Sequence, residues 1–136
     1  LFRCRVLFQE KTIRSVCLEL VGRTANFSVL HDTGNTLTDP ISGARVMIVS
    51  PQALQGLFRE NTSLLCSLDP IELQAISPDI PELAGRLRLL PFSGVGGSGI
   101  LPVFRPDCVD IDGRKTGGYL VAVSPHAAGD GFEGII

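Results

Sequence analysis

The segment Asp32-Thr33-Gly34-Asn35 has the residue types of a small reactive loop, and it follows directly on the apolar run 27–30. A carboxylate can titrate or activate a water molecule, and a neighbouring hydroxyl can fix the loop by hydrogen bonding. Glycine lets the backbone approach a neighbour closely or adopt a positive φ. The segment therefore indicates hydrolytic chemistry, with an ordinary turn as the alternative because all four residue types favour turns.

The order acid, hydroxyl, glycine is typical of the active loop of aspartic peptidases, which need two carboxylates that share one proton. Two like charges about 3 Å apart cannot both ionise, so the pair divides the roles of acid and base. The Asp-Thr-Gly triplet occurs once in the 136 residues. One chain then supplies half of a site, and a two-fold homodimer would supply the rest. Asp39, which precedes Pro40, is expected to shape a turn and not to act as a second acid.

A second candidate element is a glycine-rich stretch made of Ser93, Gly94, Val95, Gly96, Gly97, Ser98 and Gly99. A phosphate-binding loop would need a Gly-Lys-Ser/Thr ending before a helix, which this stretch lacks. It can be a plain hairpin tip. It can also be a flap that closes over an extended peptide and excludes water. The acidic loop that precedes it favours the flap.

Other combinations of reactive residues carry less weight. His31 precedes Asp32 and suggests a charge relay, but adjacent side chains of a strand point to opposite faces. The local pair Asp110 and Asp112 fits the turn at a strand end better than a metal site. The two histidines and four cysteines show no metal-ligand spacing. We therefore expect no metal and no cofactor, and the net charge of −2 gives no reason to expect nucleic acid as a partner.

The composition predicts a single β-rich domain over residues 1–136. Hydrophobic residues make up 44% of the chain, and 15 glycines and 9 prolines punctuate it. Short apolar runs between turn residues predict strands at 4–8, 16–21, 25–30, 45–49, 86–90, 100–104, 108–111 and 119–123. Ser50-Pro51 predicts a helix start, and that helix is expected to end near Asn61. Short helical turns and loops are expected over 61–83, where three prolines prevent a long element.

Three stretches resemble the peptidase domain of the sporulation sigma-E factor processing peptidases, a membrane-anchored aspartic peptidase family of endospore-forming bacteria. They are 32–40 with the following 46–48, then 89–96, and finally 104–107. The first stretch is specific to this family when its full length is considered. The other two stretches become specific to the family through their order and spacing. The resemblance spans nearly the whole chain. His31 departs from the apolar residue that the family usually has before the acid.

The resemblance implies a fold and a set of site residues. The fold is a mostly β, small closed β-barrel-like domain of the retropepsin type with one or two short helices, acting as a two-fold homodimer. Asp32 is then the catalytic carboxylate, Thr33 the hydroxyl that grips the partner loop, and Gly34 the end of the triplet. Asn35 either supports the carboxylate loop or shapes the turn, and 93–99 covers the cleft.

The resemblance also implies a substrate, an activator and a location. The substrate is the pro-sequence of sporulation factor sigma-E, and a forespore-derived signalling protein triggers the cleavage. The family's proteins carry amino-terminal transmembrane helices, so this domain would be the soluble part of a membrane-anchored protein. It would lie on the cytoplasmic face of the membrane, on the mother-cell side of the sporulation septum.

Two other functions stay open at this point. Actin-like sugar or pantothenate kinases have an Asp-x-Gly-Asn-Thr-x-Thr phosphate loop after a strand, and residues 32–38 fit that pattern. Such kinases need a longer chain and further nucleotide motifs, which we do not find in the sequence. The chain could also be a non-catalytic module that uses a retropepsin-like fold for binding, as a monomer whose loop never meets a second copy.

Overall fold

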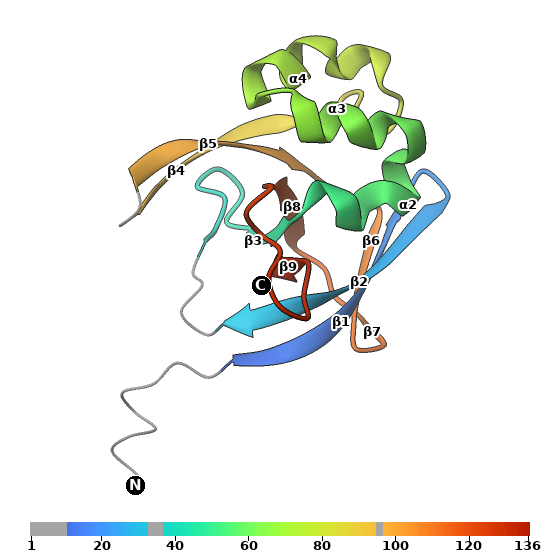
Figure 1. The fold of residues 1–136 in the computed structure, drawn as a ribbon, viewed down its shortest axis with the longest axis vertical. Helices are drawn as coiled ribbons and strands as arrows, with labels where there is room; N and C mark the ends of the chain where they lie inside the picture. The colour runs from blue at the N-terminus through green and yellow to red at the C-terminus, as the bar shows by residue number, and fades with distance from the viewer. Residues whose placement is uncertain (1–10, 33–36, 95–96) are drawn as a thin grey trace, which may run out of the picture.

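The computed structural model describes residues 11–32, 37–94 and 97–136, and its described strands form one sheet (Figure 1). The strand order is β4-β5-β8-β3-β9-β2-β1-β6-β7. The bounds are β1 Lys11–Leu20, β2 Arg23–Asp32, β3 Arg45–Val49, β4 Arg88–Gly94, β5 Gly97–Phe104, β6 Cys108–Ile111, β7 Arg114–Lys115, β8 Tyr119–Val123 and β9 Gly134–Ile135. The prediction of a mostly β domain is confirmed.

The expected closure of the sheet into a barrel is not observed. β4 and β7 are the two edges of the sheet, and no strand pairing joins them within the described residues. The physical reason lies in β7, which has two residues and pairs only with β6 in the described part of the chain. So short a strand offers few hydrogen bonds for a further partner.

The hairpin β1–β2 shows how the sequence determines the sheet. Its inward face is apolar and buried, while the residues between point outward, as expected for the period of two in a strand. Val21 and Gly22 both have positive φ angles, 52° and 74°, which is the geometry of a tight hairpin turn whose twist matches the strands. The predicted hairpin is confirmed, with longer strands than the apolar runs alone indicated.

The predicted helical region after Ser50 forms short pieces instead of one continuous helix. They are η1 Pro51–Leu54, α2 Gln55–Phe58, η2 Arg59–Asn61, α3 Thr62–Ser67, α4 Pro70–Ile76 and η3 Ser77–Asp79. The expected helix to Asn61 is interrupted at Arg59, whose φ of 49° and ψ of −118° are not helical. No helix among the described residues is long and apolar enough to cross a membrane.

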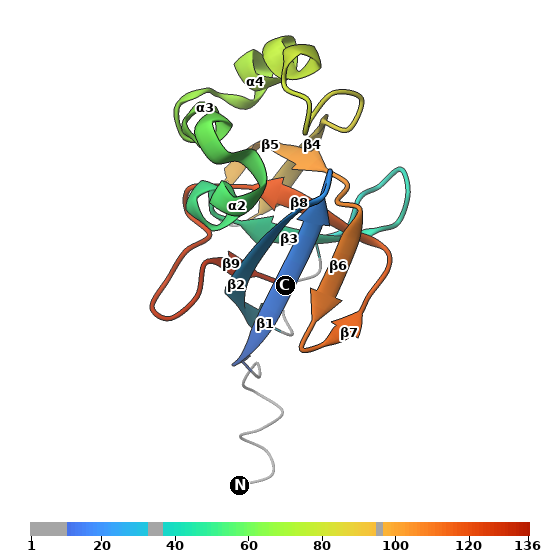
Figure 2. The same cartoon turned by 90° about the vertical axis from the view of Figure 1, so that its right-hand side faces the viewer.

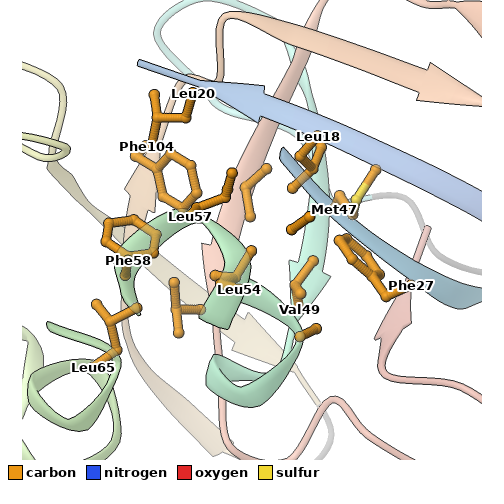
Figure 3. Close-up of a cluster of buried hydrophobic side chains, with 14 of the residues drawn as sticks. Leu18, Leu20, Phe27, Met47, Val49, Leu54, Leu57, Phe58, Leu65 and Phe104 are labelled. Carbon is orange, nitrogen blue, oxygen red and sulfur yellow. The ribbon is translucent and has the colours of Figure 1, made fainter. Parts of the chain in front are cut away.

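The short helices pack on the sheet and close the main hydrophobic core (Figures 1 and 3). Phe58 of α2 meets Phe104 of β5 edge to face, with ring centroids 5.5 Å apart. Gly56 lets α2 approach β2, since a Cβ atom there would lie 2.4 Å from the Thr24 carbonyl oxygen. A second, smaller cluster lies between β3, β4, β5 and β8 and includes Leu90 and Val103.

The strand predictions differ from the structure mainly around the glycine-rich stretch. β4 continues to Gly94 and β5 begins at Gly97, so both strands extend beyond the runs 86–90 and 100–104. The predicted strands 45–49, 108–111 and 119–123 agree with β3, β6 and β8. The strand predicted at 4–8 lies outside the described residues.

Candidate active site

Asp32 is the last residue of β2, and its side chain is half-buried. Its backbone N–H donates to the carbonyl oxygen of Ile136 at 3.1 Å, and the N–H of Ile136 donates to Leu30 at 2.9 Å. On its other side, β2 pairs with β1, where Lys11 stands opposite Asp32. The main chain that carries the acid is therefore held from both sides.

The short strand β9 provides the support next to Asp32. It lies between β2 and β3, parallel to β2 and antiparallel to β3 (Figure 1). Gly134 makes this close packing possible, because a Cβ atom there would lie 2.9 Å from the Ile48 carbonyl oxygen and 3.0 Å from a methyl group of Val29. β2 and β3, which follow each other in the sequence, are thus joined in the sheet through β9 from the end of the chain.

Thr33, Gly34 and Asn35 lie outside the described residues, and the described chain resumes at Leu37. There the Leu37 carbonyl accepts from the N–H of Val46 at 3.0 Å, and Thr38 forms a β-bridge with Arg45. Both ends of the segment that holds the triplet are consequently anchored, one by β9 and the other by the start of β3.

Asp39 has a structural role, as the sequence predicted. Its side chain is 2% exposed and accepts hydrogen bonds from the hydroxyl and N–H of Ser42 and the N–H of Ile41. Arg88 of β4 completes the set with an ion pair of 2.5 Å. The Ser42 hydroxyl and the Arg88 guanidinium hold the pKa of Asp39 well below its usual range. A carboxylate fixed in this way stays ionised and cannot share a proton with Asp32.

The glycine-rich stretch forms the tip of the hairpin β4–β5. Ser93 stands opposite Ser98, and Gly94 stands opposite Gly97, while Val95 and Gly96 lie outside the described residues. Figure 1 shows the hairpin extending beyond the body of the domain, on the same side as the end of β2. A hairpin in this place can cover a peptide bound beside Asp32, which is what a flap requires.

The hairpin is coupled at its base to the segment that follows the triplet. Leu37 packs against the second core cluster, which contains Leu90 of β4 and Val103 of β5. Asp39 and Arg88 form the ion pair between the same two segments. An apolar contact and a charged contact therefore fix the hairpin base relative to the residues downstream of Asp32.

The other reactive residues considered from the sequence do not join Asp32 in the described structure. His31 lines a hollow of about 300 Å³ together with Arg14 and Tyr119, and Asp32 is not among the residues of that hollow. This agrees with the expectation that neighbouring side chains point to opposite faces. Asp112 pairs with Arg14 at 2.9 Å and belongs to a turn. Across 11–32, 37–94 and 97–136 no group of three or more His, Cys, Asp or Glu residues could hold a metal.

Two residues that support the site were not singled out from the sequence. Ile136 acts through its backbone, and the apolar Ile-Ile pair after Gly134 is the only local signal that could have pointed to a strand there. Arg88 lies in an alternating run that predicted a strand, but its partner Asp39 is 49 positions away. Local patterns do not specify contacts over such separations.

Comparison with known proteins finds similarity along most of the chain. The model of peptidase family U4, described as sporulation factor SpoIIGA, matches residues 2–127. The sporulation sigma-E factor-processing peptidase of Bacillus subtilis (strain 168) is 32% identical over 108 residues, which are 78% of this chain and 34% of that protein. A protein of Bacillus thuringiensis subsp. kurstaki, named as a candidate sporulation sigma factor-processing peptidase, is 31% identical over 105 residues, 74% of this chain and 62% of that protein. The matched region is therefore about a third of one relative and three fifths of the other.

Proposed function

Because the chain belongs to the sporulation factor SpoIIGA family of peptidases, we propose that it is the catalytic domain of an aspartic endopeptidase that processes a sporulation sigma factor. The resemblance noted from three motifs is confirmed at the level of the family. The aspartic mechanism, the homodimer and the identity of the substrate are parts of the proposal.

One observation carries the choice of the catalytic residue. The two acids of the segment 32–40 have different environments: Asp32 is half-buried at the end of β2, whereas Asp39 is buried and bound by Ser42 and Arg88. Asp32 is thus the acid of this segment that suits proton transfer with a water molecule. Its backbone is fixed by Ile136, which favours a reproducible position of the carboxylate.

In the proposed mechanism, Asp32 and its symmetry mate in a second copy share one proton. The ionised carboxylate takes a proton from the attacking water, and the protonated one polarises the scissile carbonyl. Water attacks directly, so no acyl-enzyme forms. Thr33 would link the two loops across the dimer axis, Gly34 would permit their close approach, and Asn35 would support the loop. Residues 93–99 would close over the bound peptide.

The names of the relatives support the proposed substrate, the pro-sequence of sigma-E. Activation by a forespore-derived signalling protein, and attachment to the cytoplasmic face of the mother-cell membrane, complete the proposal as the family resemblance implies them.

The test is co-expression of the full-length protein with its activator and pro-sigma-E, scored for the shortened product. Wild type should give the product, and Asp32→Ala should give none at equal expression. Asp130→Ala, which removes another acid that is exposed, is the matched control and should retain cleavage. Product formation by Asp32→Ala would refute the proposed role of this acid.

The homodimer is tested separately by mixing. When equal amounts of wild type and Asp32→Ala subunits exchange, about a quarter of the dimers contain two acids, so activity should fall to about a quarter. A protein that works as a monomer would retain about half under the same conditions. That result, or a monomer in sedimentation together with full activity, would overturn the shared site.

A further inference from the structure

Two neighbouring hollows on the surface form one groove, which we call the basic groove. The first has a volume of about 370 Å³ and is lined in part by Arg105 and Lys115. The second has a volume of about 300 Å³ and is lined in part by Arg45. Thr116 and Tyr119 line both hollows, so the two are continuous along β6, β7 and the segment that leads into β8. Figure 2 shows β6 beside β1, with β7 next to β6.

The charge of the groove is opposite to that of the protein as a whole. Among the described residues, five cations and two carboxylates line it, whereas the whole chain has a net charge of −2. Both carboxylates are already engaged: Asp112 pairs with Arg14 at 2.9 Å, and Asp107 pairs with Arg86 at 2.8 Å. Each also accepts a backbone N–H, so their negative charge is compensated within the protein.

The other four cations of the groove form no ion pair with a described carboxylate, although Asp110 stands opposite Lys115 in the β6–β7 ladder. Among the residues that the structure describes, Arg45, Arg105, Arg114 and Lys115 have no carboxylate within ion-pair distance. The Arg45 guanidinium lies 5.4 Å from the centre of the Tyr119 ring, a contact that orients its planar donors. Like charges gathered around one hollow repel each other, and a bound anion would relieve that repulsion.

The backbone beside the groove favours a peptide as the source of negative charge. β7 is an edge of the sheet and pairs only with β6 in the described part of the chain. An extended peptide can form the few main-chain hydrogen bonds that this two-residue edge offers, while its side chains reach the neighbouring cations. A membrane surface is flat and would contact protruding residues, whereas these cations surround a hollow.

We propose that the basic groove is a docking site for an acidic peptide segment of a partner protein. Glutamate or aspartate side chains of that segment would pair with Arg45, Arg114, Lys115 and Arg105 along the groove. Asp32 is not among the described residues that line the groove, although its neighbour His31 and its backbone partner Ile136 are. The inference rests on the cations of the groove and not on the chemistry of Asp32, so it does not depend on the proposed peptidase mechanism.

Binding of a fluorescently labelled Glu-rich peptide to the purified full-length protein, followed by anisotropy, tests the proposal. The peptide should bind at low salt and weaken about tenfold or more at high salt, and the Gln-rich counterpart should not bind. Arg114→Glu with Lys115→Glu should weaken binding at least about tenfold. Arg59→Glu, an exposed cation outside the groove, is the control and should change binding less than about twofold.

The same titration contains the outcomes that overturn the proposal. Absence of binding at low salt, or equal weakening by Arg59→Glu, would show that the groove has no specific role. Binding to phosphatidylserine vesicles but not to the peptide would identify a membrane surface instead. Circular dichroism checks that the variants fold, and Arg105→Gln gives a milder test in the other half of the groove. Asp32→Ala should bind the peptide like wild type, so failure of the peptidase proposal would be seen separately.

Discussion

Asp32 and Asp39 belong to one short segment, yet the fold gives them opposite environments. Asp32 ends a strand and has a half-buried side chain, and its backbone N–H donates to Ile136. Asp39 has a side chain that is 2% exposed, and the hydroxyl of Ser42, two backbone N–H groups and the Arg88 guanidinium all bind it. The backbone bond to Ile136 holds the main chain of Asp32, whereas four hydrogen bonds hold the buried carboxylate of Asp39.

This difference fits a catalytic role for Asp32 and a structural role for Asp39. A carboxylate that accepts four hydrogen bonds is strongly held in its ionised form, so its proton affinity is too low for acid–base exchange near neutral pH. A carboxylate whose main chain is held can keep its position while its side chain exchanges a proton. We therefore expect the two aspartates to respond differently to the same isosteric substitution.

The largest effect should come from Asp32→Asn. The amide keeps the shape of the side chain and removes its proton transfer, so cleavage of pro-sigma-E should fall by at least about a thousandfold. The melting temperature should change far less than the activity, because the backbone bonds of this end of β2 to Ile136 and to β1 stay in place. A quantitative cleavage assay beside thermal unfolding measures both. A loss of activity that simply followed a loss of folded protein would contradict this separation.

Asp39→Asn should show the converse pattern, a fall of several degrees in melting temperature. The amide can neither pair with Arg88 nor accept all the bonds that Ser42 and Ile41 offer, and it would leave buried groups unsatisfied. Cleavage should decrease only as far as the folded fraction does. Asp79→Asn, in an exposed position, is the control and should leave the melting temperature unchanged.

The pH dependence of unfolding tests the same difference by a second route. The pKa of Asp39 is lowered in the folded state, so its contribution to stability is complete above the unfolded pKa of about 3.9. That contribution is lost as the pH falls from there toward the folded value. Below about pH 4, the free energy of unfolding should therefore fall less steeply with decreasing pH in Asp39→Asn than in wild type. An identical acid limb in the two proteins would show that Asp39 adds no such term. Asp107 and Asp112, whose pKa values are also lowered, will keep some acid sensitivity in both.

The support behind Asp32 is tested by Gly134→Ala. The added methyl group would lie 2.9 Å from the Ile48 carbonyl oxygen, so β9 must shift, at an expected cost of about 1–3 kcal/mol in unfolding free energy. Because Ile136 follows on this strand and binds the Asp32 N–H, activity per folded molecule should also fall. Gly117→Ala, where nothing lies within 4 Å, is the matched control for adding a methyl group. Equal unfolding free energies for the two variants would show that the tight packing of β9 is unimportant.

Much of this arrangement was predictable from local sequence. The features that were not predictable depend on contacts between segments that are far apart in the chain. The hairpin that delivers Asp32 follows from alternating apolar residues, and the turn of Asp39 follows from Asp-Pro and a later glycine. β9 has two residues, too few for a periodic signal, although it inserts between β2 and β3. The ion pair of Asp39 with Arg88 depends on how two distant segments meet. The open sheet edge at β7 likewise depends on long-range pairing and not on the composition of the strands.

The smallest effect we predict extends the comparison to the hairpin β4–β5. Phe92 lies two positions after the buried Leu90 and therefore on the same face of the strand. Its ring lies over Gly99, its partner on β5, where an added Cβ atom would be 3.0 Å from the ring. Ile100 pairs with Pro91 and so lies on the opposite face, at a similar exposure of 41% against 37% for Phe92. If the hairpin face that carries Leu90 and Phe92 covers the substrate, Phe92→Ala should raise KM by about three- to tenfold, an effect of about 1 kcal/mol.

Ile100→Ala is the matched control for that substitution, since it removes an apolar side chain of similar exposure from the other face of the same hairpin. Its KM should stay within about twofold of wild type, because an exposed side chain that does not meet the substrate contributes little. Steady-state cleavage kinetics of both variants make the comparison. Equal increases in KM would mean that the hairpin acts through its general stability and not through one face. An increase confined to Ile100→Ala would place the bound peptide on the opposite side of the hairpin, away from Asp32.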